Sequence, residues 1–323
     1  MPYAIRIHQT GGPEVLRWEE VVVGQPGPGE VRVRNTAVGV NFIDTYHRSG
    51  LYPSALPAIL GREGAGVVEA VGPRVKDFKR GDRVAYVDPS GSYAEVLLRP
   101  VTRLVKIPSG VSEQTAAAVM LKGMTAQYLL RRTYKVKKGD TILVHAAAGG
   151  VGQILCQWAR HLGAKVIGTV GSNAKAALAR KFGCGHVVVT EREKFAERVK
   201  EITKGVGVAV VYDGVGKDTF MDSLDCLAPL GIMVTYGNAS GPAPPVSPIL
   251  LMQKGSLFLT RPTLGDYIAK HEDLMANARE LFAVVKSGAV KIAVNQAYAL
   301  KDAAQAHRDL EARKTTGSTI LMP

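Results

Sequence analysis

The chain has 323 residues, of which 46% are hydrophobic and 21% are charged, and it carries a formal net charge of +13. This composition is ordinary for a soluble globular protein, and the length is sufficient for two domains with a large core. No apolar run reaches membrane-span length, and the N-terminus lacks the apolar core of a signal peptide.

The number of cysteines and the net charge narrow the possible classes of function further. Three cysteines, Cys156, Cys184 and Cys226, are too few and too spread for a disulfide framework or a Cys-rich metal site, so we expect small core residues in a cytoplasmic protein. A basic surface can bind nucleic acid or attract a cofactor with several phosphate charges. The densest basic run, Arg131–Lys138, is interpreted as a solvated helix end and loop rather than a nucleic-acid patch.

Residues 1–122 are expected to be β-rich, because short apolar runs alternate with Gly and Pro turn signals. Seven strands at this spacing are typical of a partly open β-barrel. They are predicted at Ala4–His8, Val15–Val22, Glu30–Val40, Gly64–Val71, Arg83–Tyr86, Tyr93–Leu98 and Leu104–Lys106. An Ala-rich helix is predicted from Ser112 toward Lys122, and a second helix over Thr125–Arg132 begins the crossing into the next domain.

Residues 123–261 alternate strands and helices, which predicts an α/β domain with a six-stranded, doubly wound parallel sheet. Its strands are predicted at Thr141–Ala146, Lys165–Val170, His186–Val189, Val208–Asp213, Gly231–Gly237 and Ser256–Thr260. Helices are expected over about Val151–Leu162 and over Ala174–Phe182, Phe195–Lys204 and Thr219–Leu227, with a Pro-rich loop at Gly241–Pro248.

The pattern changes again over residues 262–323. It predicts a helix near Lys270–Ser287, a strand near Gln296–Ala299, a helix over Lys301–Arg313 and a last strand at Ser318–Leu321. This tail is too short for a domain of its own, so we expect it to complete the N-terminal domain and to leave a cleft between two lobes.

The stretch Thr141–Gly152, T-I-L-V-H-A-A-A-G-G-V-G, predicts half of a dinucleotide site. An apolar strand breaks into small residues and then continues as an amphipathic helix. Missing Cβ atoms at Gly149 and Gly150 let the backbone approach a pyrophosphate, and the free N–H groups of the helix N-terminus meet its charge.

The next strand end favours NADP(H) over NAD(H). An NAD site would usually place a carboxylate about 20 residues beyond the glycine turn, to hold the ribose diol. Here Gly171, Ser172 and Lys175 stand in a segment without a carboxylate. A lysine and small donors attract a 2′-phosphate that a carboxylate would repel.

Several motifs extend this interpretation over nearly the whole chain. They are V-G-V-N-F-I-D-T-Y-H-R-S-G-L-Y-P (Val38–Pro53), G-D-R-V-A-Y (Gly81–Tyr86), H-A-A-A-G-G-V-G (His145–Gly152), V-V-Y-D-G-V-G (Val210–Gly216), Y-G-N-A-S-G (Tyr236–Gly241) and T-R-P (Thr260–Pro262). The chain resembles the zinc-free NADPH:quinone oxidoreductases, relatives of zeta-crystallin in the medium-chain dehydrogenase/reductase superfamily. The resemblance implies a GroES-like catalytic domain (residues 1–122, completed by 262–323), a Rossmann domain (123–261) and a homodimer.

Zinc-dependent alcohol dehydrogenases of this superfamily carry a Cys and a His at two positions that hold Asn41 and Arg62 here. A guanidinium does not bind zinc, and an amide is a poor ligand beside thiolate or imidazole. We therefore predict no catalytic and no structural zinc. Glu63, next to Arg62, is expected to be a hydrogen-bond or ion-pair partner.

Reduction of an electron-poor acceptor such as a quinone suits a site without a Lewis acid, because hydride transfer produces a delocalised anion. The resemblance places Asn41 and Tyr46 at the nicotinamide and substrate, with Tyr52 as a further hydroxyl on the same segment. These three are the candidate catalytic residues, through orientation and hydrogen bonding rather than as a general base.

The resemblance also implies the cofactor contacts. Gly149, Gly150 and Val151 should meet the pyrophosphate, and Gly171, Ser172, Lys175 and Thr190 the 2′-phosphate, with Thr190 standing where close relatives have a supporting Tyr. The remaining contacts should be Asn41, Phe42, Tyr46, Tyr128, Val215, Gly237, Asn238, Phe258, Thr260 and Arg313.

Other interpretations stay open. An enoyl-thioester or alkenal reductase would use the same cofactor, and a nucleic-acid-binding protein on the same fold is suggested by the net charge, although no RNP-like motif or basic arm supports it. His145 lies inside a predicted strand, which favours a hydrogen-bonded core histidine over a base.

Overall fold

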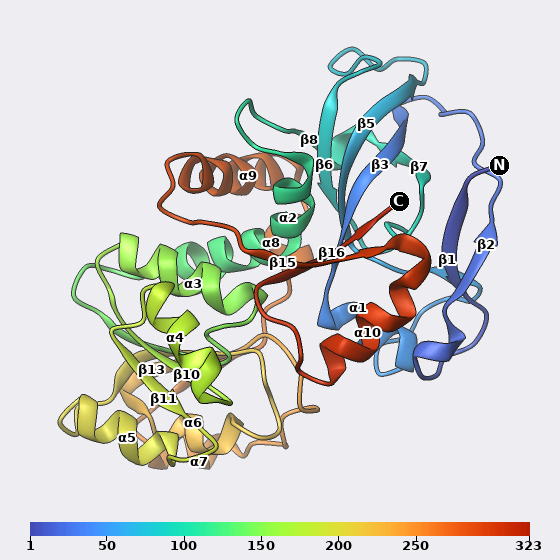
Figure 1. The fold of residues 1–323 in the computed structure, drawn as a ribbon. Helices are drawn as coiled ribbons and strands as arrows, with labels where there is room; N and C mark the ends of the chain where they lie inside the picture. Colours follow the sequence, from blue (N-terminus) through green and yellow to red (C-terminus); the bar gives the residue numbers. More distant parts are fainter. The chain divides into compact units, whose positions relative to one another are not determined.

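The computed structural model describes every residue from Met1 to Pro323 and divides into two compact units. The barrel unit comprises Met1–Met124, Ile268–Lys286 and Ile292–Pro323, and the nucleotide unit comprises Thr125–Tyr267 with Ser287–Lys291. The C-terminal segment therefore returns to the N-terminal part of the chain, as the red strand and helix among the blue elements show in Figure 1. No helix has the length and apolar character needed to cross a bilayer.

The barrel unit is built around one long strand, β3, which forms the centre of a seven-stranded sheet of order β15-β16-β3-β5-β6-β8 with β7 also on β3. A second sheet has the order β2-β1-β4. The strands are β1 (Tyr3–Ile7), β2 (Arg17–Glu20), β3 (Glu30–Val40), β4 (Ala58–Ile59), β5 (Glu63–Val71), β6 (Arg83–Val87), β7 (Val96–Pro100), β8 (Leu104–Lys106), β15 (Val294–Ala299) and β16 (Ser318–Met322).

One edge of β3 pairs with β5, whereas its other edge is shared by β7 and β16. Asn35 lies between the two pairings. Its Nδ2 donates to the carbonyls of Ser92 (3.1 Å) and Ala94 (2.7 Å), and its Oδ1 accepts from the Tyr86 hydroxyl (2.8 Å). A buried amide thus satisfies the backbone groups where the ladder changes partner.

The helices of the barrel unit depart from the prediction at two places. They are α1 (Phe42–Ser49), the first part of α2 (Glu113–Tyr128), α9 (His271–Lys286) and α10 (Ala303–Glu311). Helix α1 was not predicted. The break expected after Lys122 is wrong, because α2 runs through Gly123, where a Cβ would lie 2.5 Å from Leu281 Cδ1 in α9. This glycine allows close helix packing rather than ending a helix.

The start of the barrel is also corrected. Instead of one strand over Val15–Val22, a 3₁₀ turn at Pro13–Val15 precedes β2, because Pro13 begins the turn and cannot donate to a strand ladder. The strand expected at Tyr93–Leu98 is β7, which begins at Val96. The side chain of Tyr93 is buried in the core with Ile5, Ile7 and Val38.

The nucleotide unit confirms the six-stranded prediction. Its sheet has the order β11-β10-β9-β12-β13-β14, with every pair parallel. The strands are β9 (Thr141–Val144), β10 (Lys165–Val170), β11 (His186–Val189), β12 (Val208–Asp213), β13 (Leu227–Thr235) and β14 (Phe258–Thr260). The helices are the end of α2, which continues as a π-helical turn at Leu129–Thr133, then α3 (Gly150–His161), α4 (Asn173–Lys181), α5 (Phe195–Ile202), α6 (Phe220–Leu224), α7 (Pro248–Gln253) and α8 (Leu264–Tyr267).

Three boundaries in this unit differ from the prediction. Strand β9 ends at Val144 because Ala146 adopts a positive φ of 50° and begins the turn. Helix α6 stops at Leu224, and β13 already begins at Leu227, where it pairs with Val208. The end of the Pro-rich loop starts α7, whose Ser247 side chain accepts from the Ile249 N–H in an N-cap that precedes Pro248.

Strand order reverses at β9, which has β10 on one side and β12 on the other. In open α/β sheets the crevice at such a reversal, beyond the carboxyl ends of the strands, is where ligands bind. The fold therefore directs attention to the turns that follow β9, β10, β12 and β13.

Candidate functional site

The turn after β9 brings the start of α3 tightly against the sheet. The Ala147 N–H donates to the Thr169 carbonyl (2.9 Å), and the Gly149 N–H donates to the Ala146 carbonyl (2.8 Å). A Cβ on Gly152 would lie 2.3 Å from the Ala146 oxygen, a contact that the backbone cannot relieve. Only glycine at this position allows the helix to begin so close to the turn.

The N-terminus of α3 is suited to an anion. Its N-cap residue is Gly149, in an extended conformation and without a side chain to accept from the first turn. The N–H groups of Gly150 and Val151 therefore lack a side-chain cap at the positive end of the helix dipole. Glycine backbone, an uncapped helix start and the sheet reversal together fit a dinucleotide pyrophosphate.

His145, which follows β9, is a core residue as predicted. It is fully buried, with Nδ1 2.8 Å from Thr169 Oγ1 and Nε2 2.8 Å from Ser223 Oγ. Burial lowers the pKa of the imidazole, so the ring is neutral and both nitrogens have partners.

The turn after β10 gathers cations around the start of α4. Ser172 is the N-cap residue and its side chain makes no capping bond, while Lys175 lies in the first turn. Arg192, which the sequence did not indicate, reaches the same turn, since both its terminal nitrogens donate to the Asn173 amide oxygen (2.7 and 2.9 Å). A Cβ on Gly171 would lie 3.9 Å from Glu191 Oε1, so one carboxylate also lies beside this turn.

This arrangement fits a 2′-phosphate next to a helix N-terminus. Thr190 lies at the adjacent strand end, where its backbone N–H and its hydroxyl both donate to the Val170 carbonyl (2.9 and 3.2 Å). The hydroxyl proton of Thr190 is thus already hydrogen-bonded to a carbonyl, which makes this hydroxyl a weak donor to a phosphate.

The turns after β12 and β13 are fixed by Asp213, which is fully buried. Its Oδ1 accepts from the N–H groups of Val215 (2.7 Å) and Gly216 (3.1 Å). A Cβ on Gly237 would lie 2.5 Å from the Gly214 oxygen, so the loop carrying Gly237 and Asn238 packs directly on the neighbouring loop.

The other candidate cofactor contacts in the nucleotide unit differ in how far their side chains are exposed. Thr260 ends β14 and pairs with Val234, whereas Phe258 at its start is 58% exposed. Tyr128 is 2% exposed and stacks on Tyr267 with ring centroids 4.3 Å apart.

In the barrel unit, Asn41 belongs to a buried charged cluster. Glu63, fully buried at the start of β5, accepts from Asn41 Nδ2 (2.9 Å) and Lys122 Nζ (2.7 Å) on Oε1, and from the Leu121 N–H (2.6 Å) on Oε2. Because a carboxylate only accepts, it fixes the orientation of the Asn41 amide, with Nδ2 toward Glu63. Lys122 was not identified from the sequence.

The same cluster does not fit zinc. The position of the usual Cys ligand holds Asn41, that of the His ligand holds Arg62, and the Lys122 ammonium forms an ion pair with Glu63. The two cationic side chains repel a divalent metal, and the amide binds it poorly. No group of three or more His, Cys, Asp or Glu side chains is placed to hold a metal ion.

Helix α1 carries an aromatic group next to Asn41, its N-cap residue. The Tyr46 ring lies between Phe42 (centroids 6.5 Å apart) and Tyr52 (5.3 Å, edge to face), and the Tyr52 N–H donates to the Tyr46 carbonyl. The structure thus brings together three of the candidates that were predicted from one segment.

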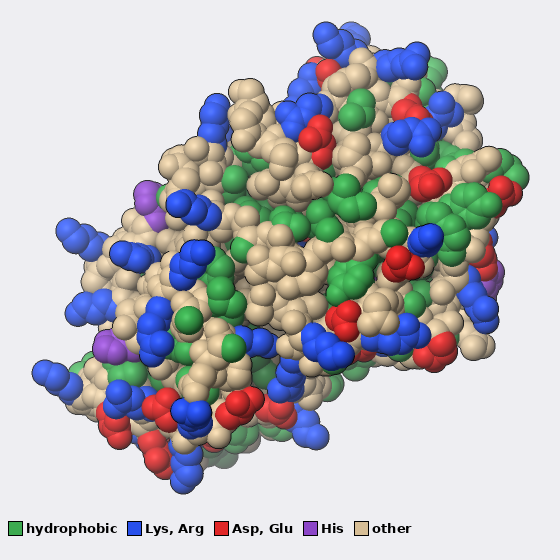
Figure 2. Space-filling model, in the orientation of Figure 1, with side chains coloured by type: hydrophobic (Ala, Val, Ile, Leu, Met, Phe, Trp, Pro, Cys, Tyr) green, Lys and Arg blue, Asp and Glu red, His purple; other side chains and the backbone are tan.

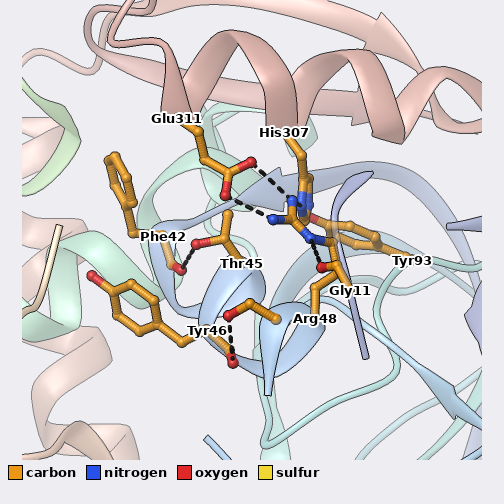
Figure 3. Close-up of polar contacts among 9 residues, drawn as sticks. Gly11, Phe42, Thr45, Tyr46, Arg48, Tyr93, His307 and Glu311 are labelled. Carbon is orange, nitrogen blue, oxygen red and sulfur yellow. Dashed lines mark hydrogen bonds and ion pairs between the residues drawn. The ribbon is translucent and has the colours of Figure 1, made fainter. Parts of the chain in front are cut away.

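Arg48, at the last turn of α1, ties this helix to α10 (Figure 3). Its two terminal nitrogens donate to Glu311 (2.7 and 3.0 Å), one of them also lies 3.1 Å from His307 Nδ1, and Nε donates to the Gly11 carbonyl (3.1 Å). The Arg48 side chain is 3% exposed and that of Glu311 is 37% exposed. This ion pair holds α1 and the end of α10 together.

The hydrogen bonds continue from His307 into the core. Because the guanidinium only donates, His307 Nδ1 accepts and Nε2 carries the proton, which faces the Tyr93 hydroxyl (3.0 Å). That hydroxyl donates to Asp44 Oδ2 (2.9 Å), which also accepts from the Asn41 N–H (2.8 Å). Burial, reinforced by Arg48, lowers the pKa of His307 to about 3, so the ring is neutral.

Arg313, a candidate cofactor contact, follows α10 two residues after Glu311. It adopts a positive φ of 58°, and its N–H donates to the Leu310 carbonyl (3.1 Å). The Arg48–Glu311 pair therefore fixes the helix end from which this arginine extends.

Basic side chains do not form one continuous patch on the face drawn in Figure 2, where Lys and Arg are interspersed with Asp and Glu. An extended nucleic acid would require a positive stripe or face.

Comparison with known proteins agrees with this geometry. The zinc-binding dehydrogenase family model matches residues 150–282, and that of the alcohol dehydrogenase GroES-like domain matches residues 27–109. A quinone oxidoreductase of Pseudomonas aeruginosa is 54% identical, and a 2-haloacrylate reductase of a Burkholderia species is 50% identical. Each alignment covers the whole of this chain and at least 99% of the relative.

A solved structure of the Escherichia coli quinone oxidoreductase in complex with NADPH matches with a TM-score of 0.97 at 49% identity, covering 99% of this chain and 100% of that one. With the barrel unit, the six-stranded nucleotide unit and full-length identity near one half in agreement, the chain belongs to the quinone oxidoreductase family of the medium-chain dehydrogenase/reductase superfamily.

Proposed function

We infer that this protein reduces quinones by hydride transfer from NADPH, without a metal. Its full-length relatives support the activity. The observation that carries the cofactor preference is the turn after β10, where Lys175 lies in the first turn of α4 and Arg192 donates to Asn173 at the start of that helix. A 2′-phosphate placed there meets two cations and a helix dipole.

The cofactor-binding residues are proposed by the part of NADPH that they meet. Gly149, Gly150 and Val151 bind the pyrophosphate, and Gly171, Ser172, Lys175 and Arg192 bind the 2′-phosphate. The ribose and nicotinamide are assigned to Asn41, Phe42, Tyr46, Tyr128, Val215, Gly237, Asn238, Phe258, Thr260 and Arg313. Support comes from the resemblance and, for the two phosphate groups, from the uncapped helix starts.

NADPH supplies a hydride, and the protein's part is to orient the acceptor and to stabilise the charge that develops on its oxygen. Asn41 is a proposed catalytic residue that acts by orienting the reactants, because Glu63 holds its amide in one orientation. Tyr46 and Tyr52, whose rings contact each other, are the proposed hydroxyl donors to the acceptor oxygen.

A second acceptor class is favoured by one relative, the 2-haloacrylate reductase at 50% identity. An α,β-unsaturated acid also becomes a delocalised anion when it receives a hydride, so the same orientation and donors would serve. Steady-state turnover with NADPH should therefore be compared for 1,4-naphthoquinone, 2-chloroacrylate and crotonyl-CoA. A higher kcat/KM for the quinone is expected, and a strong preference for either of the others would overturn the assignment.

The cofactor preference is tested by fluorescence titration of NADPH and NADH. Lys175→Ala should weaken NADPH binding at least about tenfold, the loss of one charge-assisted contact, and should leave NADH binding nearly unchanged. Lys181→Ala, at the opposite end of α4, is the matched control. An unchanged NADPH to NADH ratio in Lys175→Ala would remove this lysine from the site.

We propose in addition that the protein is a homodimer joined at β14. This strand ends the six-stranded sheet, so one edge is unpaired, and Phe258 and Leu259 on it are 58% and 38% exposed. Sedimentation should give twice the chain mass, and Phe258→Asp should give monomers. A cytoplasmic location is proposed from the sparse use of cysteine.

A further inference from the structure

Two cysteines that are far apart in the sequence meet in the nucleotide unit. Cys156 lies in α3, and Cys184 lies in the loop between α4 and β11. Their sulfur atoms are 3.4 Å apart, and the Cys184 thiol donates to Cys156 Sγ. Cys156 is fully buried and Cys184 is 6% exposed.

Glycines around Cys184 make this approach possible. Gly183 has φ +103°, and a Cβ on it would lie 3.3 Å from the Cys156 carbonyl oxygen, so the loop packs directly on α3. On the other side, a Cβ on Gly168 of β10 would lie 2.6 Å from Cys184 Sγ. The Cys184 sulfur therefore occupies the space that Gly168 leaves free.

Cys184 also lines a cavity of about 750 Å³ at the amino ends of β9, β10 and β11. This is the edge of the sheet opposite to the glycine turn, so the cavity is separate from the proposed cofactor site. Its charged lining is entirely basic and consists of Arg160, Lys165 and Lys204, with His186 beside them. Of the two cysteines, Cys184 is the one that lines this cavity, which is wide enough for a small oxidant.

We propose that Cys156 and Cys184 are a redox modification site, which hydrogen peroxide converts to a reversible intrachain disulfide. The Cys184 sulfur donates an electron pair to one peroxide oxygen and loses its proton. The O–O bond breaks, the departing oxygen takes up the thiol's proton and leaves as water, and Cys184 becomes a sulfenic acid. The Cys156 sulfur then attacks the Cys184 sulfur, the S–O bond breaks, and the hydroxyl leaves with the Cys156 proton as a second water. In total, two thiols and one peroxide give one disulfide and two waters.

The two sulfurs have different roles in this sequence. The hydrogen bond with the Cys184 thiol, together with burial, raises the pKa of Cys156 well above its usual value, so Cys156 remains protonated and acts second. Cys184 faces the cavity, where the basic lining stabilises the charge on the departing oxygen. To form the bond, the sulfurs must close from 3.4 Å to about 2.05 Å, which requires only a small local shift.

Cys226 provides an internal control. It is fully buried, its thiol donates to the Asp222 carbonyl at 3.4 Å, and burial raises its pKa to about 12. It has no sulfur partner, so it should remain a thiol.

The test treats the reduced full-length protein with hydrogen peroxide and then alkylates it under denaturing conditions. Free thiols should fall from three to one, and peptide mass spectrometry should find a Cys156–Cys184 cross-link that dithiothreitol reverses. Cys226→Ser should retain the cross-link, whereas Cys156→Ser and Cys184→Ser should lose it. In Cys156→Ser, dimedone should label Cys184.

The oxidised wild type should also melt at a higher temperature than the reduced protein, a shift that is absent in Cys156→Ser, because the cross-link joins α3 to the loop before β11. Three alkylated thiols after peroxide treatment, or a cross-link that includes Cys226, would overturn the proposal. None of these measurements uses NADPH or a quinone, so they stand apart from the proposed enzyme activity.

Discussion

The ion pair that joins α1 to α10 allows a quantitative prediction. Replacement of Glu311 by Ala removes the counter-ion of Arg48, whose side chain is 3% exposed, and leaves a buried guanidinium with only the Gly11 carbonyl and His307 Nδ1 as partners. Replacement of Arg48 by Met instead leaves Glu311, which is 37% exposed and can be hydrated. The two single changes therefore disturb the protein in different ways.

Breaking a buried ion pair from one side costs about 3–5 kcal/mol of stability. Because Glu311 is partly exposed, solvent screening reduces this, and we expect Glu311→Ala to cost about 2–3 kcal/mol. The double variant Arg48→Met/Glu311→Ala removes both charges and should cost about 1–2 kcal/mol less than the sum of the single variants. Asp309→Asn, on the same helix, is the control and should cost much less stability than Glu311→Ala.

Urea unfolding followed by tryptophan fluorescence measures these differences. The two tryptophans separate the units, because Trp18 lies in β2 of the barrel unit and Trp158 in α3 of the nucleotide unit. In a Trp158→Phe background, Trp18 reports the barrel unit alone. Additive effects of the two changes, or equal losses in Glu311→Ala and Asp309→Asn, would refute the claim that this pair holds the helices together.

Three further predictions concern other buried groups. Burial raises the pKa of Asp44 to about 7 from 3.8, so the folded state binds more protons than the unfolded state between these values, and stability should fall as pH rises from about 4 to 7. Urea unfolding midpoints measured over this pH range should fall less steeply in Asp44→Asn than in the wild type. The same dependence of the midpoint on pH in both proteins would contradict this prediction. Lys122→Met leaves the Glu63 carboxylate buried without its cation and should destabilise the protein by about 3–5 kcal/mol. The double variant Lys122→Met/Glu63→Gln should recover part of this loss, which thermal melts of both variants would measure. Gly152→Ala places a Cβ 2.3 Å from the Ala146 oxygen, so calorimetric titration should show NADPH affinity reduced more than about tenfold, and wild-type affinity would show that the turn tolerates a side chain.

Local pattern in the sequence was sufficient to find the six strands of the nucleotide unit, although not every boundary. The β10 strand was predicted at Lys165–Val170, where the structure has it, and so were β11 and β12. Buried parallel strands are short apolar runs bounded by turn residues, and each run carries its own signal. The glycine turn was equally readable, because the need for glycine arises from backbone contacts within a few residues, as at Gly152 and Ala146.

One error arose where a distant contact overrides the local signal, and another where a local signal was overlooked. The helix predicted to run from Ser112 toward Lys122 does not end there, because Gly123 is the point where Leu281 packs on α2 in the tertiary structure. Helix α1 was missed although Asn41 and Asp44 have the spacing of an N-terminal cap, a signal that was present in the sequence.

The sequence by itself therefore determined the six strands of the nucleotide unit, the glycine turn after β9 and the absence of the usual zinc ligands, since each depends on residue type and short spacing. Only the tertiary structure decided which charges are paired inside the barrel unit. Glu63 and Lys122 are 59 residues apart, and Arg48 and Glu311 are 263 apart. Their attraction matters because burial removes the competing water, and burial is a property of the assembled fold that no local stretch of sequence encodes.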